Sequence, residues 1–481
     1  MTSISKFIEQ EIVVSSSQVI NYCEKTLGLA NSVARKRIQR LPIDIYKIKG
    51  ICRDGQSILY HKSHWGTPEY FDALVDVLRR EASQHFFVYN AIKVHRGIIS
   101  KDRLTECSIS PKENVIGHKN IDTIIKDLES LHLVEQQDDQ YILKQDGYNE
   151  IGARALDLIE NITLEHFMEW GRNIGLFSYD TAKYHHTLSA YQYAIVAPSY
   201  LKTLIQQSKN GKTIPAFVIA DILLNRNINE NDVQFILHKL NNTIARNKTI
   251  NIIPFLLIGT HHQEVYKTLK TKGVIVGNID ELFGDKYSES IYGIMNLMEN
   301  AGAILKRNPD QYLKLMDDIH KLATGKTYNL KGELFEMAVG YYHGQLCQSL
   351  EISKSIVYDN KIREIDVYAV YQDKIVFAEC KGYNSKIEKD YIDKWLTEKV
   401  PVIRQWALSC DSIKDKNIVF EIWSTGGFTN EAITALENAQ GKTKKYYIHF
   451  YDSNQMIRIA REKKMQHFVD IINKNYKKAI Q

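Results

Sequence analysis

The alternation of apolar and polar positions near the N-terminus predicts two helices followed by a β-hairpin. Residues 15–41 hold two helical apolar patterns separated by a turn at Gly28. Two short alternating segments then flank Asp54 and Gly55, a dipeptide that favours hairpin turns. Helix, turn, helix and hairpin is the element order of a winged helix. We therefore expect a winged-helix domain over residues 1–85.

The same order of apolar patterns recurs over residues 86–150, which predicts a second winged-helix domain. Its groove-facing helix would carry Asp122, Asp127 and Glu129 against Lys126. These acids would repel nucleic-acid phosphates. We therefore expect an architectural or dimerising role for this second domain.

Further along, short apolar runs alternate with helical patterns between residues 192 and 283. Strands that alternate with helices indicate an α/β domain, and we expect one over residues 151–300. Amphipathic helical patterns follow. We expect residues 301–325 to be a helical linker and residues 326–481 to form a further domain. The predicted fold class is α/β and multidomain, with tandem winged helices and a central α/β domain.

Length and composition agree with several hydrophobic cores in one soluble chain. The chain has 481 residues, 44% of them hydrophobic and 25% charged. Apolar runs of about eight residues are too short to span a bilayer, and the polar N-terminus does not resemble a signal peptide. The six cysteines lack metal-binding or disulfide spacing. We expect a cytoplasmic protein without a membrane partner.

The net charge of +5 is small, but basic residues gather in the predicted first winged helix. Seven of them, against two acids, occupy its second helix and hairpin: Arg35, Lys36, Arg37, Arg40, Lys47, Lys49 and Arg53. This distribution favours binding to double-stranded DNA. The alternative is an exposed basic helix that packs on a neighbouring domain. Residues 441–481, with ten basic residues against three acids, offer a second basic surface.

A second hairpin carries the candidate chemistry. Two β-branched and aromatic runs are separated by a short polar break between Gln372 and Asp373. A turn centred there would set Asp366 directly opposite Glu379, with Cβ atoms roughly 5 Å apart. Lys381 lies two positions beyond Glu379 and would share that face of the sheet.

Two facing carboxylates repel each other unless a proton or a cation intervenes. Mg²⁺ accepts oxygen ligands and needs only one or two protein carboxylates, which leaves positions for water and a substrate phosphate. A neighbouring lysine could orient the attacking water and offset phosphate charge. The pattern therefore favours metal-assisted phosphodiester hydrolysis. The alternative is a surface hairpin with exposed ion pairs, each contributing about 0–1 kcal/mol.

The preceding helical pattern, residues 331–344, offers a fourth carboxylate. Glu336 lies at the edge of a broad apolar stripe, from which it could reach a metal directly or through water. Glu333 is the second choice.

The order of Glu336, then Asp366, then Glu379-x-Lys381 resembles the motif of the PD-(D/E)XK nuclease superfamily, the restriction-endonuclease-like fold. Isoleucine stands before Asp366, where the motif's name has proline. The resemblance implies a mixed β-sheet flanked by helices over residues 326–481. It also implies Asp366 and Glu379 as ligands of Mg²⁺, or of Mn²⁺, and Lys381 as the residue that positions the nucleophile.

These features lead us to expect a magnesium-dependent DNA endonuclease, acting in restriction or defence against foreign DNA by analogy with that superfamily. Because cutting both strands usually needs two active sites, we expect a homodimer. The alternative is a non-catalytic DNA-binding or regulatory protein that retains a nuclease-like fold. The central region resembles the rear half of a nuclease core, but Leu223 follows Asp221 where a lysine would be needed. An inactive copy and a ligand-sensing domain fit it equally well.

Overall fold

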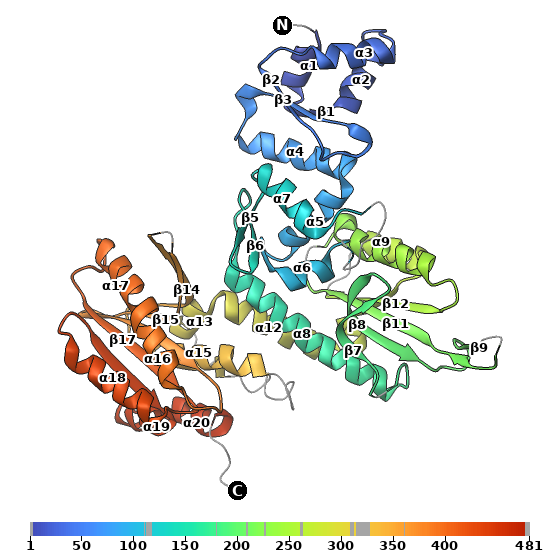
Figure 1. Ribbon diagram of the computed structural model, residues 1–481. Coiled ribbons are helices and arrows are strands. Elements are labelled where there is room, and N and C mark those ends of the chain that lie inside the picture. Colours follow the sequence, from blue (N-terminus) through green and yellow to red (C-terminus); the bar gives the residue numbers. More distant parts are fainter. Residues whose placement is uncertain are drawn as a thin grey trace. The chain divides into compact units, whose positions relative to one another are not determined.

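The computed structural model divides the chain into two compact units, Met1–Ser288 and Glu289–Gln481. Figure 1 shows both units, with many of their elements labelled. The described residues are 3–109, 111, 118–178, 180–207, 210–225, 228–259, 263–307, 312–313, 328–359 and 361–476. Within these ranges, no helix is both long and apolar enough to cross a membrane.

A small three-stranded sheet and three helices open the first unit. They are α1 (Ser3–Gln10), β1 (Val13–Ser15), α2 (Ser16–Lys25), α3 (Asn31–Gln39), β2 (Ile45–Ile48), η1 (Arg53–Gly55), β3 (Ile58–His61) and η2 (Lys62–His64). The antiparallel strands run in the order β1-β3-β2. Helix α2 begins where the Ser15 side chain accepts the backbone N–H of Gln18. The predicted hairpin is present, but Asp54 and Gly55 lie in a longer connection, residues 49–57.

A second group of helices and strands follows and shares a core with the first. Its elements are α4 (Pro68–Glu81), α5 (Ser83–Val94), β4 (Ile98–Ser100), α6 (Lys101–Cys107), α7 (Ile121–Ser130), β5 (Val134–Gln137) and β6 (Gln140–Leu143). The strands run in the order β4-β6-β5. One hydrophobic cluster extends from Ile58 in β3 through Leu74 in α4 to Leu128 in α7. Strand β3 and helix α4 therefore share a core with the second predicted winged helix, whereas α1, α2 and α3 pack around a separate cluster that includes Val19, Ala34 and Ile38.

The rest of the first unit contains a five-stranded mixed sheet. Its elements are α8 (Glu150–Asn173), β7 (Lys183–Leu188), β8 (Tyr191–Ser199), β11 (Ala216–Leu223), α9 (Glu230–Arg246), β12 (Ile252–Ile258), α10 (Gln263–Thr271), β13 (Ile275–Asn278) and α11 (Ile279–Phe283). A two-stranded ribbon, β9 (Gln206–Gln207) with β10 (Thr213–Ile214), lies apart from this sheet. In the order β7-β8-β11-β12-β13, the first two pairings are antiparallel and the last two parallel.

The second unit is built around another five-stranded sheet. The elements are α12 (Asp285–Glu299), which crosses the division between the units, α13 (Ala301–Arg307), α15 (Tyr328–Gly344), β14 (Ser349–Tyr358), β15 (Lys361–Val370), β16 (Lys374–Lys381), α16 (Lys389–Lys394), η3 (Trp395–Lys399), α17 (Val400–Ser409), β17 (Asn417–Ser424), α18 (Asn430–Lys442), β18 (Tyr447–Asp452), α19 (Ser453–Glu462) and α20 (Gln466–Asn475). The predicted mixed sheet flanked by helices is confirmed. Apolar side chains on one face, such as Phe377 and Phe420, pack against α16, η3, α17 and α18.

The two sheets have the same topology. In the order β14-β15-β16-β17-β18, the first two pairings are again antiparallel and the last two parallel. A helix precedes the first strand of each sheet, and helices connect the third strand to the fourth and the fourth to the fifth. The chain therefore contains one strand arrangement twice, in two units that fold around separate cores.

The start of the predicted linker belongs to the core of the second unit. Leu305 in α13 is fully buried, and Lys306 donates a hydrogen bond of 3.2 Å to the backbone oxygen of Gly344. A Cβ atom on Gly302 would lie only 2.3 Å from the backbone oxygen of Leu350 in β14. Helix α13 is thus packed against the sheet. Apart from residues 312–313, the remainder of the predicted linker lies outside the described residues.

Candidate active site

Asp366 and Glu379 lie on the neighbouring strands β15 and β16. The strand register pairs Val367 with Ala378, one position before Asp366 and Glu379. The register predicted from the turn is therefore confirmed as far as Val367, and the two carboxylates lie on adjacent strands next to this last pair. One carboxylate oxygen of Asp366 accepts the backbone N–H of Cys380 at 2.7 Å.

The backbone of β15 is irregular at Asp366. On the β14 side, Ile352 pairs with Val367 and Lys354 pairs with Ile365, but no regular pair joins Ser353 to Asp366 between them. Ser353 has a φ of 52°. On the β16 side, the regular pairing ends at the neighbouring Val367. The Asp366 carboxylate thus takes a backbone N–H that a regular ladder would pair with a carbonyl. This hydrogen bond fixes the carboxylate at the end of the hairpin.

Three side chains converge on Glu379. The ammonium of Lys381 lies 2.8 Å from Oε1 of Glu379, and the hydroxyl of Tyr391 in α16 donates to the same oxygen. The ammonium of Lys399, at the end of η3, contacts Oε2 of Glu379 and lies 3.8 Å from Oδ1 of Asp366. The described cluster therefore pairs two carboxylates with two ammonium groups.

The surroundings push the pKa values of the two carboxyl groups in opposite directions. Burial, and then the negative charge of Glu379, raise the pKa of Asp366 above its ordinary value. Burial would also raise the pKa of Glu379, but Lys399 and Lys381 outweigh it and lower this pKa to about 2. Burial would lower the pKa of both lysines, yet the carboxylates raise it. Of the two carboxyl groups, Asp366 takes a proton more readily.

The sequence interpretation missed Lys399 and Tyr391. Both belong to residues 386–400, which the apolar periodicity showed only as an amphipathic helix. The sequence shows a basic residue, Lys399, near the end of the helix that connects β16 to β17, and this could have suggested a partner for the carboxylates. The spacing of residues along the strands could not show that this helix packs close to Glu379.

Glu336, on α15, contacts strand β14 beside Asp366. Its Oε2 accepts a hydrogen bond of 3.1 Å from the Ser353 hydroxyl, and its charge is one of the causes that raise the pKa of the Cys380 thiol. Cys380 alternates with Glu379 and Lys381 along β16, so its side chain faces the opposite side of the sheet. The described contacts bring Asp366, Glu379 and Lys381 together without Glu336. The side chain of Glu333 lies outside the described residues.

The donor atoms at this site fit the chemistry of a hard divalent cation. Over the whole residue, Asp366 and Glu379 are 6% and 4% exposed, and they offer carboxylate oxygens from adjacent strands. Two such carboxylates are sufficient for Mg²⁺ when water and phosphate complete its coordination shell. The Lys399 ammonium contacts both carboxylates. A metal bridging these two groups would have to move it.

The seven basic residues predicted to bind DNA are all exposed. On α3, only Ala34 and Ile38 are buried, so Arg35, Lys36 and Arg37 are directed away from the core. Two of the seven have described local contacts: Arg35 donates to the Asn31 side chain at 2.8 Å, and Arg53 donates to the backbone oxygen of Arg80. The helix and its hairpin therefore present positive charge to solvent.

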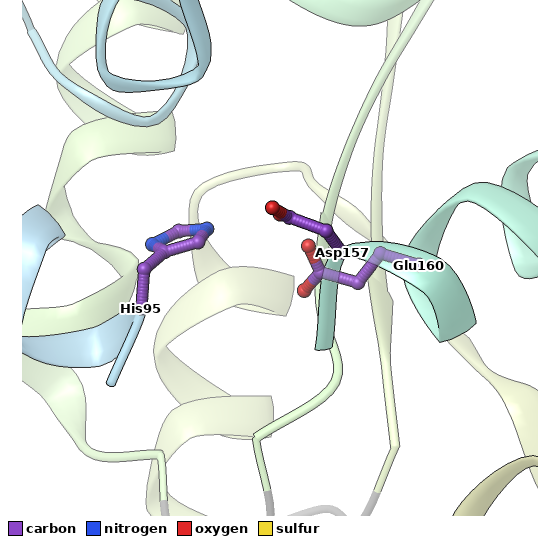
Figure 2. A group of neighbouring side chains, drawn as sticks. All are labelled: His95, Asp157 and Glu160. Carbon is purple, nitrogen blue, oxygen red and sulfur yellow. The ribbon is translucent and has the colours of Figure 1, made fainter. Parts of the chain in front are cut away.

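A further group of potential metal ligands lies in the first unit. Figure 2 shows His95 facing Asp157 and Glu160 of α8, and their ligand atoms all lie within 4.8 Å of one another. The guanidinium of Arg103 contacts Glu160 and lies 3.8 Å from Oδ1 of Asp157. Nδ1 of His95 bonds the backbone oxygen of Ala91. Because Arg103 already supplies the positive charge, we assign this group to a structural ion network.

The chain has no match among protein-family models or curated proteins. Among solved structures, protein VC1899 from Vibrio cholerae aligns at 10% identity and a TM-score of 0.17, over 44% of this chain and 50% of that one. Restriction endonuclease FokI bound to DNA aligns at 11% identity over 56% and 58%, and a second FokI structure at 12% over 61% and 64%, both with TM-scores of 0.17. The alignments cover about half to two thirds of those proteins. TM-scores this low carry no argument about function.

Proposed function

We propose that residues 326–481 form a metal-dependent nuclease domain of the restriction-endonuclease-like type, which hydrolyses phosphodiester bonds in DNA. The convergence of Asp366, Glu379 and Lys381 at one end of the β15–β16 hairpin carries this proposal. The sheet combines antiparallel and parallel strand pairings. This agrees with the mixed sheet that the resemblance to the restriction-endonuclease-like fold implies. Glu336 is proposed as a fourth carboxylate that acts directly or through water.

In this proposal, Asp366 and Glu379 would hold Mg²⁺ or Mn²⁺, which would supply Lewis acidity toward a phosphate oxygen and increase the acidity of a water molecule. Lys381, anchored by Glu379, orients that water and offsets the charge that develops on the phosphate. Tyr391 holds the Glu379 carboxylate through its hydroxyl.

Binding of duplex DNA is proposed for residues 1–85, as a winged helix. The element order β1, α2, α3, β2, β3 and the seven exposed cations support this role. The region over residues 86–150 is proposed as a second winged helix without direct phosphate contacts. The basic stretch at residues 441–481 lies in the same unit as the candidate catalytic residues and offers further positive potential near the substrate. Restriction or defence against foreign DNA is the proposed setting.

A second candidate function is that of a DNA-binding or regulatory protein whose nuclease-like domain does not cleave. One observation favours it: Lys381 and Lys399 already balance the charges of the two carboxylates in the cluster. The two functions differ in whether divalent cations support cleavage.

The test is cleavage of supercoiled plasmid by the purified full-length chain with Mg²⁺ or Mn²⁺. We expect nicked and linear products, and we expect Asp366→Asn or Lys381→Ala to lower the rate by about 10²- to 10³-fold. Asp411→Asn, at an exposed carboxylate elsewhere in the second unit, is the matched control and should retain activity. Absence of cleavage with every divalent cation, or full activity of both site variants, would exclude the nuclease assignment.

A further inference from the structure

Lys399 places a positive charge against both carboxylates that would hold a metal ion. Its ammonium contacts Oε2 of Glu379 and lies 3.8 Å from Oδ1 of Asp366. Its side chain is 20% exposed, whereas those of Asp366 and Glu379 are 9% and 5% exposed. A long, partly exposed lysine side chain can move toward solvent without moving the strands. The ammonium therefore has a path toward solvent.

A break in regular helix geometry sets the position of Lys399. It is the last residue of η3, a π-helical turn between α16 and α17. Pro401 follows in the first turn of α17 and has no N–H for the carbonyl four residues earlier, which explains a departure from regular α-helix here. Trp395, at the start of the turn, is buried in the core beside Phe420. With this end anchored, the wider turn holds Lys399 over β16. Single π turns are often found at functional positions.

The sheet of the first unit contains a comparable acid–lysine pair. Asp221 is the third residue from the end of β11, as Glu379 is of β16. Lys239, from the following helix α9, lies 2.7 Å from Oδ2 of Asp221. This sheet therefore also pairs its strand carboxylate with a lysine from the crossover helix.

The first sheet lacks the other two groups of the candidate site. Continuing its register places Ala194 opposite Asp221, and the N–H of Ala194 donates to Asp221 at 3.2 Å. Leu223 stands two positions after Asp221. A lysine from the crossover helix is thus retained in a sheet that has neither the second carboxylate nor the strand lysine. Its role there is to neutralise a buried carboxylate.

The two lysines differ in how firmly they are held. Lys239 is fully buried, and its ammonium also donates to the backbone oxygens of Glu106 and Gln192 at 2.8 Å each. Lys399 is partly exposed, and the contacts described for its ammonium are with the two carboxylates. To leave Asp221, the Lys239 ammonium would have to give up buried contacts with the backbone. The contacts described for the Lys399 ammonium do not include such backbone contacts.

We propose that Lys399 is a built-in counter-cation that closes the site to metal ions and has to be displaced before a divalent cation can bind between Asp366 and Glu379. This inference rests on the proposed function and adds a regulatory step to it. An ammonium and a divalent cation cannot share the same carboxylate oxygens at close range without strong repulsion. Metal affinity in the absence of substrate is therefore weakened by Lys399.

The experiment measures Mn²⁺ binding to the full-length protein without DNA, by calorimetric titration. Lys399→Met keeps the length of the side chain and removes its charge. We expect it to bind Mn²⁺ at least about tenfold more tightly than the unmodified chain. Lys399→Arg retains a cation and should not show this gain. Lys414→Met, which removes an exposed lysine paired with Asp411, is the charge-matched control and should bind like the unmodified chain. Circular dichroism establishes that each variant is folded.

A final pair of variants separates failure of the inference from failure of the proposed function. Glu379→Gln, alone and combined with Lys399→Met, should remove Mn²⁺ binding. If binding depends on Glu379 but Lys399→Met leaves the affinity within twofold of the unmodified chain, the inference is wrong and the metal site stands. If Mn²⁺ binds to none of the folded variants, Lys399→Met included, both the metal site and the inference are wrong.

Discussion

Glu421 is a buried carboxylate on β17 whose charge is held by its neighbours. It is 3% exposed, lies 3.2 Å from Nε2 of His343, and accepts a 2.9 Å hydrogen bond from the indole N–H of Trp423. Burial alone would raise the pKa of Glu421, but the two histidines, His343 and His449, outweigh it and lower this pKa to about 2. Ionised Glu421 therefore stabilises the second unit.

The sign of this pKa shift predicts a dependence of stability on pH. The pKa of Glu421 is lower in the folded than in the unfolded chain, so its contribution is complete above about pH 4.5 and is lost as the pH falls toward 2. We expect the free energy of unfolding to lose on the order of 3 kcal/mol from this group. Urea unfolding of the chain and of Glu421→Gln between pH 5 and pH 2.5 measures it. The variant should lose less stability over this range, and equal losses would contradict the prediction.

At the level of single residues, the sequence was sufficient to predict positions that depend only on the local geometry of a hairpin. Alternation along β15 and β16, together with a turn of defined centre, was enough to predict that Asp366 faces Glu379 and that Lys381 shares their face. Lys399 is 20 positions beyond Glu379 and meets it only because a crossover helix folds back over the sheet. Contacts of this kind depend on tertiary packing, which spacing does not encode.

Among the elements, α3 offers the clearest test of nucleic-acid binding. Replacing Arg35, Lys36 and Arg37 by Ala leaves the buried Ala34 and Ile38 in place, so the fold should be kept. We expect weaker binding to duplex DNA of any sequence, and a salt dependence whose log–log slope is reduced by about 0.9 for each phosphate that the variant no longer neutralises. Fluorescence anisotropy at several salt concentrations measures both quantities.

The matched control for α3 comes from the second predicted winged helix. Lys126→Ala with Lys144→Ala removes positive charge from residues 86–150, for which we expect no phosphate contact. These changes should leave affinity and slope nearly unchanged. If they weaken binding as much as the α3 changes do, or if the α3 changes leave the slope unaltered, the assigned roles of the two regions are wrong.

Helix α13 gives a test of where the second unit begins. Gly302→Ala would force a Cβ to within 2.3 Å of the Leu350 backbone oxygen, and we expect it to lower the free energy of unfolding by about 1–3 kcal/mol. Gly441→Ala, within α18, meets nothing within 4 Å and should be neutral or slightly stabilising. Denaturant unfolding compares the two. Equal effects of the two substitutions would indicate that residues 301–307 are a linker and not part of the core of the second unit.

Element prediction succeeded where the apolar period was clear and missed elements whose apolar face packs against a distant part of the chain. Strands β15 and β16 and helices α2 and α3 were predicted from their apolar periods. Helix α4 was not assigned, although Thr67 and Pro68 form a helix start. Its apolar face completes a core that spans both predicted winged helices, so no local pattern marked it as part of either one.

On the scale of the whole chain, only one of the two similar sheets carries the complete set of candidate catalytic residues. The other has Ala194 and Leu223 at the corresponding positions. Their common topology was not predictable in full, because the apolar pattern did not mark β7 in the first sheet and marked only β15 and β16 in the second. One such centre in the part of the chain that the structure describes is the basis for expecting two chains in double-strand cleavage.

Mixing active and inactive chains tests this expectation. When an excess of Asp366→Asn is added to a fixed amount of unmodified chain, paired chains would mostly hold one active centre. We expect conversion of plasmid to the nicked form to continue while conversion to the linear form falls several-fold. Gel analysis of the two products over time provides the measurement. An equal fall of both products, or of neither, would contradict pairing of chains during cleavage.

The crossover that brings Lys399 to Glu379 also orders events during synthesis. The β15–β16 hairpin is local and leaves the ribosome before residues 389–399 do, and hairpins form within microseconds. At that moment Asp366 and Glu379 face each other with only Lys381 nearby. The parallel strand β17 is added later, and the docking of its crossover delivers the second ammonium. For the nascent chain, addition of β17 to the sheet and arrival of the second ammonium at the acidic pair are therefore a single event.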